Sequence, residues 1–428
     1  MLNSKTGERE LCYVTIVDAV TPIEGYDRVE LAHVGGWTVV VGKGEFHAGD
    51  PAIYFEIDSK LPEVEPFINM EFLAKKHYKI KTQKMCRVLS QGLLMSAANF
   101  GWEAITNIDN MADIVAIKDS NGVYHYNGAH WYADDESRFL TKQLGVTYYV
   151  AEDNTRKANS VDKYKKMAQR NGKLFSHQPF RWLMKRTWGR KFLFVFFGRK
   201  RDKNTNFPTH FPFVKKTDQE RCENMTWVLN DKTPFIVTQK CDGSSGTYIL
   251  EKRKNLFGIK YEFYVCSRNV RQLTPKQKSF YDENYYWECA IKYDIKNKLK
   301  DYLEKHPYLD YVCWQGEVCS PKIQNNPHGL TETHLFCFHM IDSKIGKYDI
   351  RDAKKIWKEY NMETVPIINE NYILPDDFEE FKLTADGMYD PSVCEGKKSQ
   401  AREGFVYYKT TDPNFSFKNV SRKYLLNH

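Results

Sequence analysis

The sequence predicts a small all-β module followed by a larger α+β domain, and three observations support this fold class. Between about Leu11 and Phe100, short runs of alternating or apolar residues are separated by turn residues, as in a small barrel. From Phe207 onward, strand-like runs alternate with helical patterns. The 428 residues suffice for two or three domains, and 28% charged with 14% aromatic residues exclude a largely disordered chain.

Turn residues separate the strands that we predict in the N-terminal module, which we place at residues 1–100. Turns are expected at Pro22–Gly25 and at His47–Asp50. A closing strand is expected to begin within Ser90–Leu94. The clearest strands are CYVTIV (12–17), WTVVVG (37–42) and AIYFEI (52–57).

Residues 101–206 have poor periodicity, and we assign them to a linker or insertion. A short helix is expected at Ser160–Arg170. Between Lys185 and Lys203 there are eight Lys or Arg and one acid, interleaved with Trp and Phe. Such a mixture suits phosphate contact and base stacking. A solvated basic hairpin over an apolar strand explains the segment equally well.

Residues 207–428 form the predicted α+β domain. Helices are expected between Thr274 and Leu303 and between Asp352 and Tyr360. If the strands form one site, runs far apart in sequence must share a sheet and each bring one chemical group to a common point. The predicted strands are FIVTQKC (235–241), GTYILE (246–251), EFYVCS (262–267), DYVCWQGEV (310–318), HLFCFHMID (334–342) and GFVYYKT (404–410).

Lys240 is the candidate nucleophile. It ends a predicted strand, and a turn containing Asp242 and Gly243 leads into the next strand. A lysine amine can attack phosphorus if it is deprotonated. Its free pKa of ~10.4 must then be lowered by a cation, a metal or desolvation. Taken alone, the tetrapeptide Lys-Cys-Asp-Gly is better explained as a lysine beside a tight turn.

An ordered series of groups follows Lys240, most of them on or beside predicted strands. The series is Arg268, Glu317, the alternating Phe336 and Phe338, Glu403 and Lys418. Together with Lys240, it resembles the ordered motifs of the covalent nucleotidyltransferases, which are the polynucleotide ligases and mRNA capping enzymes. The resemblance spans about 207–428. It implies an ATP-grasp-like adenylation domain built from antiparallel sheets.

The resemblance also implies roles for the individual residues. Lys240 would carry AMP, and Lys418 with Arg422 or Lys423 would contact phosphates. Phe338 or Phe336 would stack on adenine, and the other would pack in the core. The remaining nucleotide contacts would come from Gln239, Asp242, Gly243, Arg268, Glu317 and Glu403, with Asp242, Glu317 and Glu403 also holding Mg²⁺ or Mn²⁺. The sequence departs from the family at its last motif, since Ser416 and Val420 stand where a second lysine is usual.

The N-terminal module identifies the branch. Its run from Pro22 to Asp58 is similar to the OB domain of the fifth ATP-dependent RNA ligase family, which precedes the transferase domain. The segment Phe213–Arg221 is also similar to that family. We therefore expect a monomeric RNA ligase that seals nicks or broken ends in RNA or RNA/DNA duplexes, with a role in RNA repair. The alternatives are a DNA-nick ligase and a non-catalytic RNA-binding protein.

The remaining features indicate a protein of a reducing compartment. The ten cysteines form no CxxC pair, and the polar N-terminus is unlike a signal peptide. We expect the protein in the cytoplasm or the nucleus. One group of histidines and a cysteine could form a zinc site, but its spacing fits no standard zinc finger. We expect its members to have core or surface roles. This group is His328, His334, Cys337 and His339.

Overall fold

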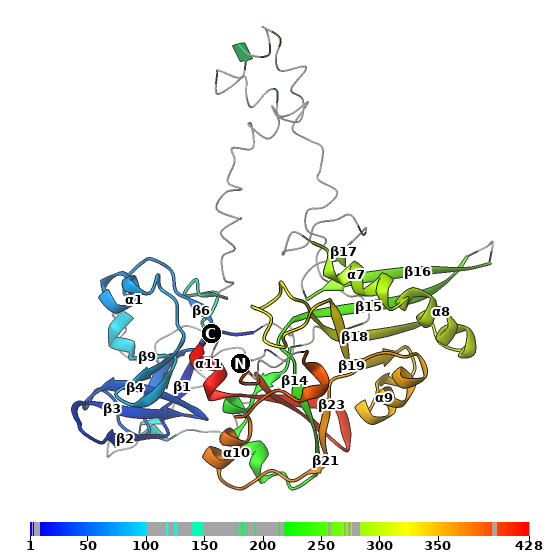
Figure 1. Ribbon diagram of the computed structural model, residues 1–428. Helices are drawn as coiled ribbons and strands as arrows, with labels where there is room; N and C mark the ends of the chain where they lie inside the picture. The colour runs from blue at the N-terminus through cyan, green and yellow to red at the C-terminus, as the bar shows by residue number, and fades with distance from the viewer. Residues whose placement is uncertain are drawn as a thin grey trace. The chain divides into compact units, whose positions relative to one another are not determined.

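A computed structural model describes most of the two predicted domains (Figure 1). The described residues are 1, 3, 9–100, 139–148, 218–255, 258–268, 283–395 and 400–427, with isolated positions between these ranges. The chain divides into two compact units, residues 1–149 with 209–428, and residues 150–208. The helix predicted at 160–170 and most of the basic segment 185–203 lie outside the described residues.

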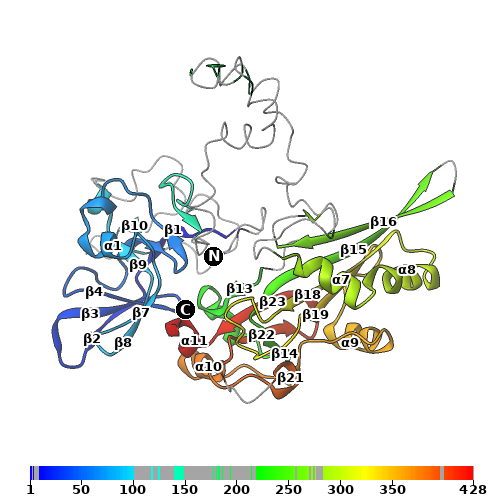
Figure 2. The ribbon, with the colours of Figure 1, turned by 45° about the horizontal axis from the view of Figure 1, so that its top comes forward.

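The N-terminal module is all-β apart from short helical turns, as predicted (Figures 1 and 2). Its sheets follow the orders β1-β5-β9 and β2-β3-β4, with a β7-β8 hairpin. Trp37 and Tyr54 are fully buried in a cluster with residues of both sheets, and Phe55 is buried in a second cluster with Phe67 of η1. The elements are β1 (Cys12–Ile16), β2 (Ala19–Ile23), β3 (Tyr26–Val34), β4 (Trp37–Gly42), β5 (Pro51–Phe55), β6 (Ser59–Lys60), η1 (Phe67–Asn69), α1 (Glu71–Lys75), β7 (Thr82–Met85), β8 (Val88–Gln91), β9 (Leu93–Met95) and η2 (Ala97–Phe100).

Residues 139–148 pack onto this module, although we assigned them to the linker. Phe139 forms a β-bridge with Tyr13. Leu140 and Val146 are buried in the same apolar cluster as strands β1 and β5. The structure therefore adds these residues to the N-terminal core. Short pairs complete the region: β10 (Ile117–Lys118) with β11 (Tyr124–His125), and β12 (Thr147–Tyr148) with β6.

The C-terminal domain contains two mostly antiparallel sheets, which confirms the predicted α+β class. The five-stranded sheet has the order β13-β23-β22-β14-β21, and the six-stranded sheet has the order β17-β16-β15-β18-β19-β20. The first sheet consists of β13 (Glu220–Arg221), β14 (Phe235–Lys240), β21 (Ile367–Tyr372), β22 (Gly404–Lys409) and β23 (Asp412–Val420). The second consists of β15 (Ser244–Asn255), β16 (Gly258–Ser267), β17 (Arg271–Gln272), β18 (Tyr311–Cys319), β19 (His334–Asp342) and β20 (Gly346–Lys347).

Helices cover one face of the six-stranded sheet. Residues of α7, α8 and α9 form one buried apolar cluster with β15, β18 and β19, and the other face of the sheet is left for the site. No described helix is long and apolar enough to cross a membrane. The helices and turns are η5 (Cys222–Asn224), η6 (Thr226–Asn230), α7 (Tyr285–Lys292), α8 (Ile295–Lys305), α9 (Ile350–Glu359), α10 (Phe378–Thr384), η7 (Pro391–Val393) and α11 (Arg422–Asn427).

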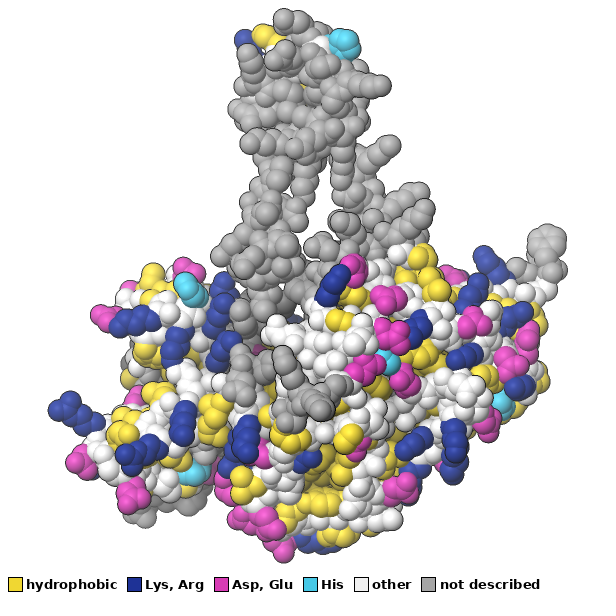
Figure 3. All heavy atoms as spheres, viewed as in Figure 1, with side chains coloured by type: hydrophobic (Ala, Val, Ile, Leu, Met, Phe, Trp, Pro, Cys, Tyr) yellow, Lys and Arg dark blue, Asp and Glu magenta, His cyan; other side chains and the backbone are white. Residues whose placement is uncertain are grey.

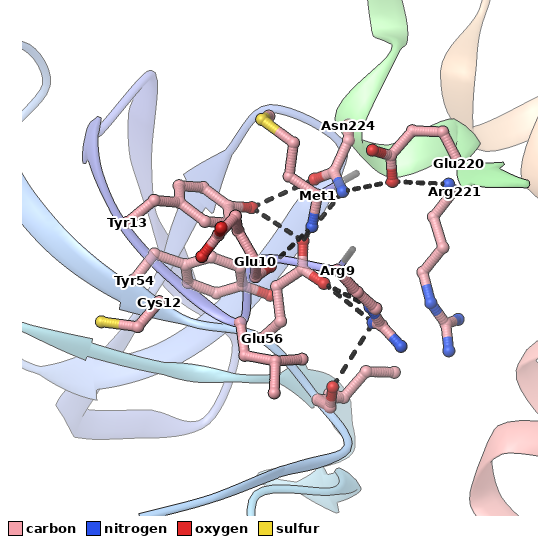
Figure 4. A network of polar contacts seen from close by, with 12 residues as sticks. Met1, Arg9, Glu10, Cys12, Tyr13, Tyr54, Glu56, Glu220, Arg221 and Asn224 are labelled. Atoms are coloured by element: carbon pink, nitrogen blue, oxygen red, sulfur yellow. Dashed lines mark hydrogen bonds and ion pairs between the residues drawn. The ribbon is translucent and has the colours of Figure 1, made fainter. Parts of the chain in front are cut away.

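Asn224 joins the two domains through its side-chain amide (Figure 4). Its oxygen accepts hydrogen bonds from Trp37 Nε1 at 2.7 Å and from the Tyr13 hydroxyl at 3.1 Å. Its nitrogen donates to Glu56 at 2.8 Å. Arg9 also pairs with Glu56, with a shortest distance of 2.8 Å. A buried carboxylate is tolerated when it is paired and hydrogen-bonded in this way.

Candidate active site

Lys240 lies where the chain passes from one sheet to the other. It is the last residue of β14, and its register partner on β22 is Gly404. Glu403, one residue earlier, is therefore adjacent, and its Oε1 lies 2.6 Å from Lys240 Nζ. After a three-residue turn the chain enters β15, where Ser245 pairs with Glu317 of β18. Two distant carboxylates thus reach the lysine through strand pairing.

Glycine is required at both turns beside Lys240. A Cβ on Gly243 would lie 2.5 Å from the Val318 carbonyl oxygen. Gly404 has φ +147°, and a Cβ there would lie 2.1 Å from the Asn419 carbonyl oxygen. The close approach at Gly243 also lets its backbone N–H donate to the Glu317 carboxylate.

The carboxylates hold Lys240 as a cation. Burial lowers the pKa of Lys240, but Glu403, Glu317 and Asp242 outweigh this effect, and the net pKa is above its ordinary value. Desolvation alone therefore does not activate this amine. The amine becomes a nucleophile only when the negative charge around it is reduced.

The carboxylates themselves carry excess negative charge in a buried setting. Burial raises the pKa of Glu317 to about 7, and Lys240 only partly opposes this effect. Burial and Glu403 also raise the pKa of Asp242, which accepts a hydrogen bond from the Tyr424 hydroxyl. Asp242 Oδ2 and Glu403 Oε2 are buried without a hydrogen-bond partner.

This donor set suits a divalent cation. Mg²⁺ and Mn²⁺ bind carboxylate oxygens, and two such oxygens are unsatisfied here. Among the residues that the structure describes, no three His, Cys, Asp or Glu side chains converge as a metal site. Asp242, Glu317 and Glu403 instead surround the Lys240 ammonium. That they hold the metal stays a prediction.

Basic side chains lie beyond the carboxylates. Lys418 of β23 pairs in register with Val406 and with Arg221 of β13. Burial together with Arg221, Arg9 and Lys240 lowers the pKa of Lys418 to about 7, against the opposing effect of Asp218. Arg9 and Arg221 each pair with Asp58, so their charges are partly neutralised, and an anion bound beside Lys418 stays a prediction.

Arg268 follows β16 and is held by Asp218. Its Nη2 lies 2.5 Å from an Asp218 carboxylate oxygen, and its guanidinium lies 5.8 Å from the centre of the Tyr148 ring. Asp218 lies within the segment 213–221 that resembles the RNA ligase family, yet the sequence did not single it out. Asp218 also interacts with Lys418, where it partly opposes the lowering of the Lys418 pKa.

A β-bulge distinguishes Phe338 from Phe336. On β19, Cys337 pairs with Gly316 and His339 pairs with Gln315, so Phe338 has no partner on β18. Phe336 is 3% exposed and packs in the core, whereas Phe338 is only partly buried against the same cluster. A bulge re-aims the side chain that it inserts. Phe338 is therefore the more exposed of the two rings, and its stacking on adenine stays a prediction.

Two predicted contacts point elsewhere in the structure. The Gln239 side-chain oxygen accepts from the Asp390 backbone N–H at 2.6 Å, and strand alternation places Gln239 on the face of β14 opposite Lys240. The Arg422 guanidinium pairs with Glu379. Neither side chain joins the group around Lys240, because each already has a partner.

Four residues that the sequence did not predict as site contacts complete the surroundings. These are Asp218, His328, Tyr389 and Tyr424. His328 Nε2 accepts from the Asp242 backbone N–H at 3.1 Å. Tyr389 accepts from the Glu403 backbone N–H at 3.1 Å. For Asp218 the signal was its place in the family-like segment 213–221. No regular spacing relates His328, Tyr389 or Tyr424 to the motifs.

Two family models match the chain. The model of an OB-fold domain matches residues 11–97, and the model of RNA ligase matches residues 233–425. Among curated proteins, none matches the chain. The two models correspond to the two predicted domains, in the predicted order.

Solved structures of an RNA ligase of Naegleria gruberi are similar along the whole chain. A mutant with AMP and Mn is 24% identical, with a TM-score of 0.64, and the match covers 98% of this chain and 99% of that chain. The same ligase with pyrophosphate is 24% identical, with a TM-score of 0.65 and the same coverage. A second mutant with AMP and Mn is 25% identical, with a TM-score of 0.64. These likenesses confirm the fold.

Proposed function

We propose that this chain, in which an OB-fold match at residues 11–97 precedes an RNA ligase match at residues 233–425, is an ATP-dependent RNA ligase. It seals 3′-OH and 5′-phosphate ends, including nicks, through AMP bound covalently to Lys240, and serves RNA repair. The observation that carries the proposal is the Lys240 amine 2.6 Å from Glu403, with Glu317 and Asp242 around it and Lys418 nearby.

The reaction consists of three transfers at phosphorus. Lys240 Nζ loses its proton and forms a bond to the α-phosphorus of ATP, while the bond to the β-phosphate oxygen breaks and pyrophosphate leaves. AMP then passes to the 5′-phosphate of the RNA. Finally, a 3′-OH displaces AMP and closes the strand. Each step depends on positioning and on neutralising charge on phosphate oxygens.

The residues of the site divide this work. Lys418 and Arg268 contact the phosphates and the ribose, and Phe338 stacks on the base. Glu403 is the nearest acceptor for the proton that Lys240 must lose. Asp242, Glu317 and Glu403 would hold Mg²⁺ or Mn²⁺, which supplies positive charge that weakens their hold on the lysine proton.

The β7–β8 hairpin supports RNA as the substrate. Between Phe72 and Trp102 the chain has six Lys or Arg and no Asp or Glu. Lys75, Lys81 and Lys84 are exposed, and Figure 3 shows dark-blue basic side chains over the N-terminal domain. Strand β7 packs against α11, whose Tyr424 hydrogen-bonds Asp242. Exposed basic side chains of this kind can contact a phosphate backbone.

Transfer from a preformed adduct tests the proposal. Protein labelled with AMP is freed of ATP and mixed with a nicked duplex whose 3′ end is ribose or deoxyribose. The label should move to the 5′-phosphate and be released on sealing, faster with ribose. Faster sealing with deoxyribose would identify a DNA-nick ligase, and an adduct that never transfers would exclude a ligase of either kind.

A further inference from the structure

Two buried aromatic rings hold the backbone on either side of the Lys240–Glu403 pair. His328 lies in the connection between β18 and β19, and Tyr389 lies between α10 and η7. His328 is 1% exposed and Tyr389 is 7% exposed. Their ring centres are 4.3 Å apart. Neither residue belongs to a motif that the proposed function uses.

His328 is an acceptor for the turn that follows Lys240. The Asp242 backbone N–H donates to His328 Nε2 at 3.1 Å, so the neutral ring carries its hydrogen on Nδ1. The His328 carbonyl also accepts from the Glu395 N–H at 3.0 Å.

Tyr389 is the corresponding acceptor for the carboxylate side of the pair. The Glu403 backbone N–H donates to its hydroxyl at 3.1 Å. The next residue, Asp390, donates its backbone N–H to the Gln239 side chain at 2.6 Å. The segment that carries Tyr389 is thus hydrogen-bonded both to Gln239, next to Lys240 on β14, and to Glu403, the partner of Lys240.

We propose that His328 and Tyr389 are positioning residues, which together fix the backbone of Asp242 relative to that of Glu403 and so set the distance from the Lys240 amine to its carboxylates. The proposal rests on the proposed function. The two rings contact each other, so a shift at one backbone amide is transmitted to the other. A misplacement near 1 Å at a reacting group costs about 100-fold in rate.

The test measures lysyl-AMP formation in a single turnover with labelled ATP. His328→Phe keeps a ring but removes the acceptor, and Tyr389→Phe removes only the hydroxyl oxygen. Each should lower the rate constant at saturating ATP by roughly tenfold or more, with little change in KM for ATP. His328→Gln restores an acceptor near the position of Nε2 and should remain within about threefold of the wild type.

His306→Phe is the matched control. His306 stacks on Tyr302 at 4.2 Å, and its Nδ1 lies 2.8 Å from the Tyr302 carbonyl oxygen. It directly follows helix α8, which bears no site residue. Partial unfolding lowers the amplitude of a single turnover, whereas mispositioning lowers the rate constant. If the wild type forms lysyl-AMP and His328→Phe has the same rate constant as His306→Phe, the inference is wrong. Failure of the wild type to form lysyl-AMP would instead overturn the proposed function.

Discussion

At the scale of single residues, the charge states of two lysines determine what the site can do. Lys240 is held as a cation by three carboxylates. The pKa of Lys418 is shifted in the opposite direction, because burial and neighbouring cations lower it to about 7. Bound phosphate would reverse both effects, since it adds negative charge beside Lys418 and brings a metal to the carboxylates. We therefore expect ATP and its metal to bind together at this site.

The Lys418 pKa predicts a pH dependence of ATP binding. An amine with a lowered pKa loses its charge as pH rises through that value, here about 7. The Kd of an ATP analogue with an uncleavable α–β bridge should rise up to about tenfold per pH unit above it. Calorimetry between pH 6.5 and 8.5 measures this.

Lys418→Arg provides the control, because arginine stays charged. Any dependence that remains in this variant belongs to Glu317, whose pKa burial raises to about 7. A Kd that is independent of pH in the wild type contradicts the charge state assigned to Lys418.

The motif residues could be predicted from the sequence, but their supports could not. Lys240, Glu317 and Glu403 follow one another at recognisable strand ends, and the structure brings them together. His328 and Tyr389 act through single hydrogen bonds to backbone N–H groups. Every residue except proline has a backbone N–H. The sequence therefore does not show which N–H groups need a side-chain acceptor such as His328 or Tyr389.

At the scale of elements, two phenylalanines of β19 differ in burial beside a β-bulge. The sequence predicted strand 334–342 with its bounds, and it predicted one stacking ring and one core ring. It could not decide between them, because the bulge depends on the register with β18. Simple alternation would place Phe336 and Phe338 on one face.

Alanine substitutions separate these roles. Phe338→Ala removes a stacking surface and should weaken ATP binding by about 1–3 kcal/mol, with little change in Tm. Phe336→Ala leaves a cavity in the core and should cost about 3–5 kcal/mol of unfolding free energy, with Kd nearly unchanged in the folded fraction. Calorimetric binding and denaturant unfolding check the pair. The reverse pattern would assign the base to Phe336.

The β7–β8 hairpin predicts a separate effect on RNA. Lys81→Glu with Lys84→Glu should weaken binding of nicked RNA and lower the salt dependence of log Kd by about 2. Lysyl-AMP formation from ATP alone should be unchanged, because the hairpin contacts no nucleotide.

Helix α9 offers a matched control for that charge change. Lys354 and Lys358 are exposed there, and their change to Glu alters net charge equally. If this control weakens RNA binding as much as the hairpin variant does, the effect comes from total charge and the hairpin assignment is wrong.

At the scale of the whole molecule, the two domains are joined next to the site. Asn224 connects Trp37, Tyr13 and Glu56 over separations of 168 to 211 residues. In helix α11, Leu425 packs against the N-terminal core, while the neighbouring Tyr424 hydrogen-bonds Asp242. Local sequence patterns predicted each domain but not this joint, because such contacts depend on how the domains pack.

Labelling with ATP that carries its label on the α-phosphate tests the central claim most directly. Digestion of the denatured protein and mass spectrometry should place AMP on Lys240, through an acid-labile bond to nitrogen, and Lys240→Ala should carry none. Label on another residue, or label retained by Lys240→Ala, would contradict the account.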